Sequence, residues 1–94
     1  MNRVFEEKEL EAQIMYYLWN QGAWSETYTN YDKMKRRLSK IVANNGENVQ
    51  RRVEELVKKR WVLWKKNGDT ISLNLYAKVE IKKFLYAQGF LDLR

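Results

Sequence analysis

An Asn67-Gly68 pair stands between two short apolar segments, and it constrains the fold more than any other feature of the chain. Asn-Gly favours a two-residue type I′ turn, because both central positions of that turn need a positive φ. A turn centred on the pair aligns Trp64 with Ile71, Val62 with Leu73, Lys65 with Thr70, and Leu63 with Ser72. The first two pairs are apolar and the last two are mostly polar, whereas a shift of one residue would mix the two faces. Residues 61–74 are therefore predicted to form a β-hairpin in this register.

Four other segments carry apolar residues at the spacing of one helical face. They predict helices at about 6–21, 30–43, 46–60 and 75–88. The four apolar stripes are Leu10, Ile14, Tyr17 and Leu18; Tyr31, Met34, Leu38, Ile41 and Val42; Val49, Val53, Leu56 and Val57; and Ala77, Ile81, Phe84 and Leu85. Asn30 or Thr29 is expected to cap the second helix and Asn74 the last, because their side-chain oxygens can accept from free backbone N–H groups. Gly22 and Gly89 are expected to end the first and last helices.

The connections between these helices differ in character. Residues 23–29 (AWSETYT) are β-branched and aromatic without a helical period, which predicts a short strand or extended connection that pairs with the hairpin. Residues 43–46 (Ala-Asn-Asn-Gly) are typical of a tight turn, with Asn45 able to cap the following helix. The 94 residues are enough for one small core, so we expect a single domain spanning residues 1–94.

The composition argues against several kinds of chemistry. The chain has no cysteine and no histidine, which removes disulfides, thiolate nucleophiles, imidazole bases and the usual zinc sites. We therefore expect no enzyme activity, no metal and no cofactor. The longest apolar run, residues 14–19, is far shorter than the ~20 residues of a membrane span, and the N-terminus is acidic rather than signal-like. We expect an intracellular, cytoplasmic protein that does not enter the membrane.

Charge is distributed unevenly along the chain. The net charge is +6, yet residues 33–66 hold twelve basic and three acidic side chains, a net of +9, while residues 1–32 carry a net of −4. A segregated basic stretch concentrates phosphate and gains free energy by releasing counterions, which makes nucleic acid the first partner to consider. A solvated charged surface with no partner explains the same pattern, and charge alone leaves the two explanations equally weighted.

Apolar residues also lie outside the predicted core stripes, on a second side of the helix at 6–21 and along one side of the helix at 75–88 and beyond. The candidate contacts of a homodimer among them are Phe5, Ala12, Trp19, Val79, Tyr86 and Phe90. Packing at the edges of a small core accounts for these residues equally well, so both interpretations stand.

The order of the predicted elements, from helix and short strand through two helices joined by a tight turn to a hairpin and a last helix, resembles winged helix-turn-helix domains. In MarR-like and PadR-like regulators the third helix commonly reads as polar residues, then Arg-Arg-hydrophobic-x-x-Leu, then a wing strand. Residues 48–78 here read NVQRRVEELVKKRWVLWKKNGDTISLNLYAK. The chain departs from that pattern at Arg60, where many relatives have glycine, and at Asn74, where they have a threonine cap. The resemblance implies an α+β fold with a three-helix core, a C-terminal β-hairpin wing and an additional C-terminal helix.

The resemblance also implies a function and a set of contact residues. Such domains bind double-stranded DNA sequence-specifically, commonly as dimeric transcriptional regulators, with the first half of the third helix in the major groove and the wing on the backbone or minor groove. The residues that match base-contacting positions are Asn48, Gln50 and Arg51, which can pair with adenine or guanine edges. Those that match backbone-contacting positions are Lys33, Arg36, Arg37 and Arg52, and those in the wing are Lys65, Lys66 and Asn67.

An alternative function is a protein-interaction winged helix within a replication or transcription assembly. It rests on aromatic and apolar residues that a small core could leave exposed, namely Trp19, Trp24, Trp61 and Leu63.

The predicted third helix carries acidic as well as basic residues. Glu47, Glu54 and Glu55 fall on the outward side of the helix at 46–60. Carboxylates near phosphate are repulsive, so Glu54 and Glu55 would limit DNA contact to the first two turns of that helix. Glu47 could accept from a cytosine amino group or act as a first-turn acid that complements the helix dipole, and the second role is the commoner one.

Overall fold

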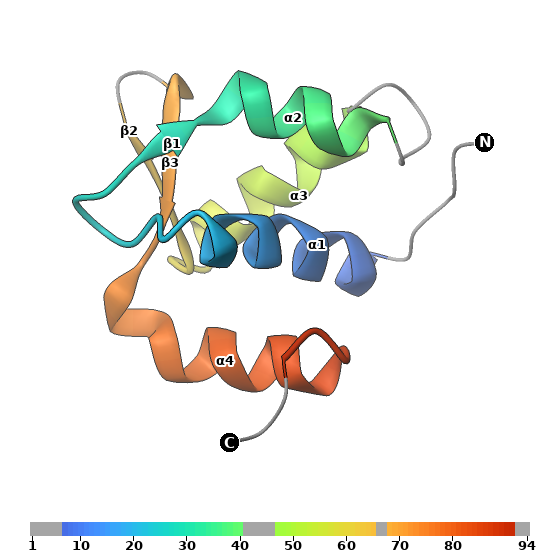
Figure 1. The fold of residues 1–94 in the computed structure, drawn as a ribbon, viewed down its shortest axis with the longest axis vertical. Helices are drawn as coiled ribbons and strands as arrows, with labels where there is room; N and C mark the ends of the chain where they lie inside the picture. The colour runs from blue at the N-terminus through green and yellow to red at the C-terminus, as the bar shows by residue number, and fades with distance from the viewer. Residues whose placement is uncertain (1–6, 41–46, 66–67, 92–94) are drawn as a thin grey trace.

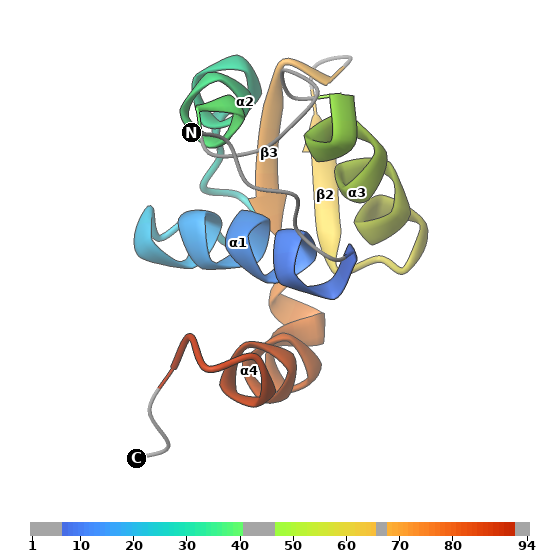
Figure 2. The ribbon, with the colours of Figure 1, turned by 90° about the vertical axis from the view of Figure 1, so that its right-hand side faces the viewer.

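The computed structural model describes residues 7–40, 47–65 and 68–91, and within these ranges it contains four α-helices and one three-stranded antiparallel sheet. In chain order the elements are α1 (Glu7–Asn20), β1 (Thr29–Asn30), α2 (Tyr31–Ser39), α3 (Glu47–Lys58), β2 (Val62–Lys65), β3 (Thr70–Leu73), the 3₁₀ helix η3 (Leu75–Ala77) and α4 (Lys78–Ala87). Figures 1 and 2 show α1 lying between α2 and α4, with the sheet extending from the level of α2 toward α4. This order of elements fits a winged-helix-like arrangement. None of the helices in the described ranges is long and apolar enough to cross a bilayer.

The observed hairpin register is the one predicted from the apolar and polar faces of the two strands. β3 lies between β1 and β2, and β2 joins it in the four predicted pairs, Val62–Leu73, Leu63–Ser72, Trp64–Ile71 and Lys65–Thr70. β1 pairs with β3 from the other side through Thr29 and Asn30, so the connection after the first helix does join the hairpin. Asn67 lies outside the described residues. Gly68 has a φ of +90°, and a Cβ there would approach Trp64 Nε1 at 2.8 Å, so this position needs a glycine.

The predicted apolar stripes form the core. The buried apolar residues are Leu10, Ala12, Ile14, Met15, Tyr17 and Leu18 of α1; Ala23 after α1; Tyr31, Met34 and Leu38 of α2; Val49, Val53 and Leu56 of α3; Val62, Ile71 and Leu73 of the hairpin; and Ala77, Ile81 and Leu85 after it. Val57 and Phe84 pack against this cluster but are only partly buried. Ile41, Val42 and Asn45 lie outside the described residues. Burial of these side chains is the main favourable term that offsets the loss of chain entropy on folding.

The end of α3 has the geometry expected of a glycine, although the residue is arginine. Across Arg60, whose φ is 64°, the Trp61 N–H donates to the Leu56 carbonyl at 3.1 Å. This is a Schellman motif, in which the residue after the helix takes a left-handed conformation. Gly22 and Gly89 occupy the same position after α1 and α4, as predicted. Arg60 therefore keeps the corner between helix and wing at a cost of about 1 kcal/mol in backbone strain.

Asparagine side chains set the starts of two helical segments. Asn30, rather than Thr29, caps α2 by accepting from the Lys33 N–H at 2.8 Å. Asn74 accepts from the Tyr76 N–H at 3.0 Å, as predicted for a cap, but the segment it opens is the short 3₁₀ helix η3 followed by α4. The prediction of one continuous helix over 75–88 is therefore wrong at its first turn, which is 3₁₀ helix, and the α-helix begins at Lys78.

Candidate nucleic-acid interface

α2 presents a strongly basic surface to solvent. Its apolar residues share one side of the helix, so the remaining long side chains project outward. The cations among them, counted here with the C-cap residue Lys40 and called the α2 cations, are Lys33, Lys35, Arg36, Arg37 and Lys40. All but the half-buried Lys35 are exposed, and these four line a shallow hollow in the protein surface. Asp32 is the only acidic residue in the α2 sequence. The helix therefore carries a concentrated positive charge on its solvent side.

The cations of α2 have no acidic partners in the part of the chain that the structure describes. Lys35 Nζ instead donates to Gln50 Oε1 of α3 at 3.4 Å. The guanidinium of Arg37 lies 5.9 Å from the centre of the Tyr17 ring. Neither contact neutralises a charge, so the α2 surface attracts phosphate over a range of about 8 Å at physiological salt.

The exposed cations of α3 are arranged differently. Arg51 lies 3.3 Å from Glu47, and Lys58 lies 3.5 Å from Glu55. Glu54 is exposed on the same helix. The outward surface of α3 therefore has no excess of positive charge, although the sequence of this region is rich in basic residues.

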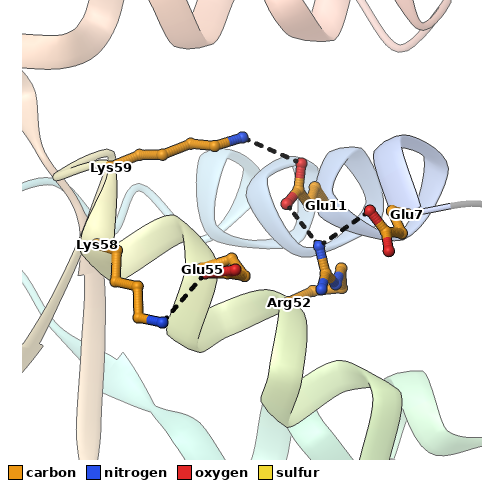
Figure 3. A network of polar contacts seen from close by, with 6 residues as sticks. All are labelled: Glu7, Glu11, Arg52, Glu55, Lys58 and Lys59. Carbon is orange, nitrogen blue, oxygen red and sulfur yellow. Dashed lines mark hydrogen bonds and ion pairs between the residues drawn. The ribbon is translucent and has the colours of Figure 1, made fainter.

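A buried carboxylate holds α3 against α1. The Glu11 side chain is only 5% exposed and accepts from Arg52 Nη1 at 3.3 Å, while Lys59 Nζ lies 3.6 Å from its other oxygen (Figure 3). Arg52 also lies 3.5 Å from Glu7. Arg52 of α3 and Lys59, the residue after α3, are about two helical turns apart, so one carboxylate of α1 contacts this segment at two levels. A carboxylate this deeply buried needs such partners, because an unpaired buried charge is strongly destabilising.

Arg52, which was predicted to contact the DNA backbone, lies in different surroundings from the other predicted backbone contacts. Its side chain is 18% exposed and faces α1, whereas Lys33, Arg36 and Arg37 are exposed as that prediction requires. Neighbouring residues of a helix point about 100° apart. That rotation separates the outward Arg51 from the inward Arg52.

The residues that match base-contacting positions have different surroundings. Gln50 and Arg51 are exposed in the first turns of α3, and the hydrogen bond from Lys35 to Gln50 joins this end of α3 to the basic surface of α2. Asn48 is half-buried and lines a small hollow beside Glu7 of α1. We call the α2 cations together with Gln50 and Arg51 the α2–α3 surface. Asn48 lies at its edge, toward α1.

Only one of the predicted wing residues can be placed. Lys66 and Asn67 lie outside the described residues. Lys65 is exposed at the end of β2 and, together with Arg60 and Leu63, lines a hollow along the outer face of the hairpin. Figures 1 and 2 place the start of β3, which pairs with Lys65, at the same end of the molecule as α2.

Three polar groups between α2 and the hairpin are buried without hydrogen-bond partners. They are the Tyr31 hydroxyl, Trp64 Nε1 and Thr70 Oγ1, and none of them bonds to any described residue. The Tyr31 and Trp64 rings lie 5.4 Å apart. Burial, together with the negative charges of Glu54 and Asp32, raises the pKa of the Tyr31 hydroxyl to about 12. Apolar spacing marked Tyr31 as a core residue, but no sequence signal distinguishes a paired hydroxyl from an unpaired one.

Several candidate dimer contacts are occupied within the chain. Ala12 is fully buried in the core and has no surface to offer a second copy. Trp19 packs against Trp24 with ring centroids 5.3 Å apart, and Phe90 packs against a tyrosine of α1 at 5.2 Å. Phe5 lies outside the described residues. The apolar second side of the first helix is thus largely covered by the chain itself.

Val79 and Tyr86 differ from those candidates, because they are 62% and 45% exposed. Leu75 and Tyr76, which the sequence analysis missed, are 51% and 96% exposed just before them. They precede the periodic stripe of the last helix, so spacing alone did not single them out. Trp61, on which the alternative function partly relied, is half-buried against a phenylalanine of α4, with ring centroids 5.6 Å apart.

No family model, curated protein or solved structure matches this chain. Among the residues that the structure describes, no acidic side chains gather in a group that could hold a metal ion.

Proposed function

We propose that this chain binds double-stranded DNA sequence-specifically, as a winged-helix transcriptional regulator of the MarR-like or PadR-like type. The first turns of α3 enter the major groove with Gln50 and Arg51, and the cations of α2 contact the phosphate backbone. The observation that carries this proposal is the group of α2 cations, which have no acidic partners among the described residues and are joined to α3 through the hydrogen bond from Lys35 to Gln50.

The α2 cations account for the affinity. Each phosphate that a cation neutralises releases condensed counterions, which adds about −0.9 to the slope of log K against log salt concentration. The four exposed cations of α2 therefore contribute a slope between about −3 and −4 if all of them reach phosphate. This contribution does not depend on base sequence.

Arg51 and Gln50 account for the sequence preference. The side chains of Arg51 and Glu47 are 66% and 67% exposed, and an exposed ion pair of this kind is worth less than ~1 kcal/mol. Guanine O6 and N7 can therefore replace Glu47 as the partner of the guanidinium. Gln50 can pair with adenine through the same amide that accepts from Lys35.

The proposal is tested by selecting duplexes that bind the protein from a random pool and titrating them over a range of salt concentrations. Arg36→Gln combined with Arg37→Gln should weaken binding and reduce the salt slope by about two. Lys82→Gln combined with Lys83→Gln removes the same charge from α4, which lies on the other side of α1 (Figure 1). This matched control should leave both the affinity and the slope unchanged.

Arg51→Ala tests the reading of bases separately. It should reduce discrimination at one base position by about 1–3 kcal/mol, with little change at the others. A random pool that yields no enriched sequence would contradict sequence-specific binding. Equal losses of affinity in the α2 and α4 double variants would contradict the assignment of the backbone contacts to α2.

A further inference from the structure

The large apolar side chains that remain exposed gather on one short stretch of the chain. Within residues 7–40, 47–65 and 68–91 they are Leu75, Tyr76, Val79 and Tyr86, which belong to η3 and α4. We call these four residues the α4 strip. An exposed apolar cluster on a charged helix is typical of a site of interaction with another molecule.

Helical geometry places lysines on both sides of the α4 strip. At about 100° per residue, Tyr86 lies only ~20° from Val79 around the helix axis. Lys82 and Lys83 lie ~60° to one side of Val79 and ~40° to the other, and both are exposed. Glu80, the only acidic residue in the α4 sequence, lies further round at ~100°. Val79 and Tyr86 of the strip therefore share one side of α4 with two lysines, and Leu75 and Tyr76 precede them on η3.

The α4 strip is separate from the α2–α3 surface. α1 lies between α4 and α2 in both Figure 1 and Figure 2. A molecule bound along the outer side of α4 would therefore leave the α2 cations free to bind phosphate.

A second copy of this chain is a poor occupant for the strip. In an antiparallel, two-fold contact, Val79 can face Tyr86 of the other copy. Lys82 and Lys83 have the same midpoint along the helix as Val79 and Tyr86, so Lys82 then faces Lys83 of the other copy. Ammonium groups from both copies then meet in the middle of the contact. Juxtaposed like charges oppose association, so the charge pattern of the strip disfavours self-pairing.

We infer that the α4 strip is a docking surface for an acidic amphipathic helix of another protein. Apolar side chains of the partner, spaced three or four residues apart, cover Tyr76, Val79 and Tyr86. Its aspartates or glutamates pair with Lys82 and Lys83. The exposed tyrosines supply the large, rigid contact area that is typical of the energetic centre of an interface. This interaction goes beyond DNA binding and does not depend on it.

Panning a display library of random peptides, each long enough to form several helical turns, against the 94-residue chain tests the inference. We expect the enriched peptides to be net negative, with apolar residues three or four apart. Their affinity, measured by fluorescence anisotropy, should fall at least about tenfold for Lys82→Glu combined with Lys83→Glu. The uncharged pair Val79→Ser and Tyr86→Ser should cause a similar loss. Arg36→Glu combined with Arg37→Glu reverses the same charge on α2 and should leave peptide binding unchanged.

All these variants exchange exposed side chains, and far-UV circular dichroism will check that each remains folded. The inference is overturned if no peptide is enriched, or if the enriched peptides lack acidic residues. It is also overturned if sedimentation reveals a dimer that Val79→Ser dissociates, since a second copy would then be the occupant. Because the assay contains no DNA, failure here is distinguishable from failure of the proposed DNA binding.

Discussion

The neighbouring helices α2 and α3 put similar residues to different uses. Each buries three apolar side chains and carries several cations on its other sides. On α3, Arg51, Arg52 and Lys58 contact carboxylates, whereas the α2 cations meet none among the described residues. The number of basic residues in a segment therefore gives its charge, but ion pairing decides how much of that charge a partner meets.

Replacing Arg52 should have the largest effect on stability, and it tests the ion pairs on the side of α3 that faces α1. Arg52→Ala leaves the Glu11 carboxylate buried, with Lys59 as its one remaining cationic partner among the described residues. Removing one partner of a buried ion pair costs ~3–5 kcal/mol, and because Lys59 stays beside Glu11 we expect the free energy of unfolding to fall by about 2–3 kcal/mol. Arg51→Ala is the matched control, because its pair with Glu47 is exposed and its loss should stay below ~0.5 kcal/mol. Equal losses in urea unfolding would remove the distinction between the two arginines.

The buried side of α2 predicts a loss of stability in alkaline solution. The pKa of Tyr31 is raised from its ordinary 10.0 to about 12 by burial and by the charges of Glu54 and Asp32, so the folded chain holds this proton more tightly than the unfolded chain. The stabilisation is complete below pH 10 and is lost as the pH rises to about 12, by up to about 2 kcal/mol relative to Tyr31→Phe. Urea unfolding of both proteins at rising pH measures the difference. Parallel losses would mean that the hydroxyl is not responsible.

The C-terminal ends of the two helices offer a smaller test. Arg60 has a φ of 64°, so Arg60→Gly should raise the free energy of unfolding by up to about 1 kcal/mol through relief of strain. Lys40, at the end of α2, has a right-handed φ of −70°, so Lys40→Gly should lower it by about 0.5–1 kcal/mol. Thermal or urea unfolding separates the two outcomes. A loss in Arg60→Gly would contradict the left-handed corner at the end of α3, and a gain in Lys40→Gly would contradict the right-handed conformation at the end of α2.

Relief of charge repulsion on α2 should be the smallest effect. Lys33 and Arg37, and likewise Arg36 and Lys40, are like charges four residues apart, and each such pair opposes the helix by about 0.2–0.5 kcal/mol. Arg36→Gln combined with Arg37→Gln should therefore stabilise the fold by about 0.5 kcal/mol at low salt, with the gain fading at high salt. If this variant is less stable than the parent, the α2 cations have structural partners, and the contrast with α3 fails.

Local sequence patterns were sufficient for much of the fold. The hairpin register follows from the parity of apolar and polar residues around Asn67-Gly68, and the helix stripes follow from their spacing. Asn30 and Asn74 were identifiable as caps, because a cap acts within three residues of itself. Lys33, Arg36, Arg37, Gln50 and Arg51 are exposed, and the DNA contacts assigned to them from the resemblance stay predictions.

Other features of the candidate site had no local signal. Lys35 was not singled out, yet it links α2 to α3 through Gln50. The exposure of Leu75 and Tyr76 depends on which neighbours cover the start of the last helix, and spacing does not report that.

The sequence by itself determined the helices, the hairpin register and the segregation of charge, because these depend on residues close together in the chain. Only the tertiary structure decided which charges remain available to a partner. Arg52 and Glu11 are 41 residues apart, and their pairing depends on how α3 is rotated against α1. A rotation of about 100°, the step from one helical residue to the next, would exchange the places of Arg51 and Arg52. That rotation is set by the packing of the whole core rather than by any local pattern.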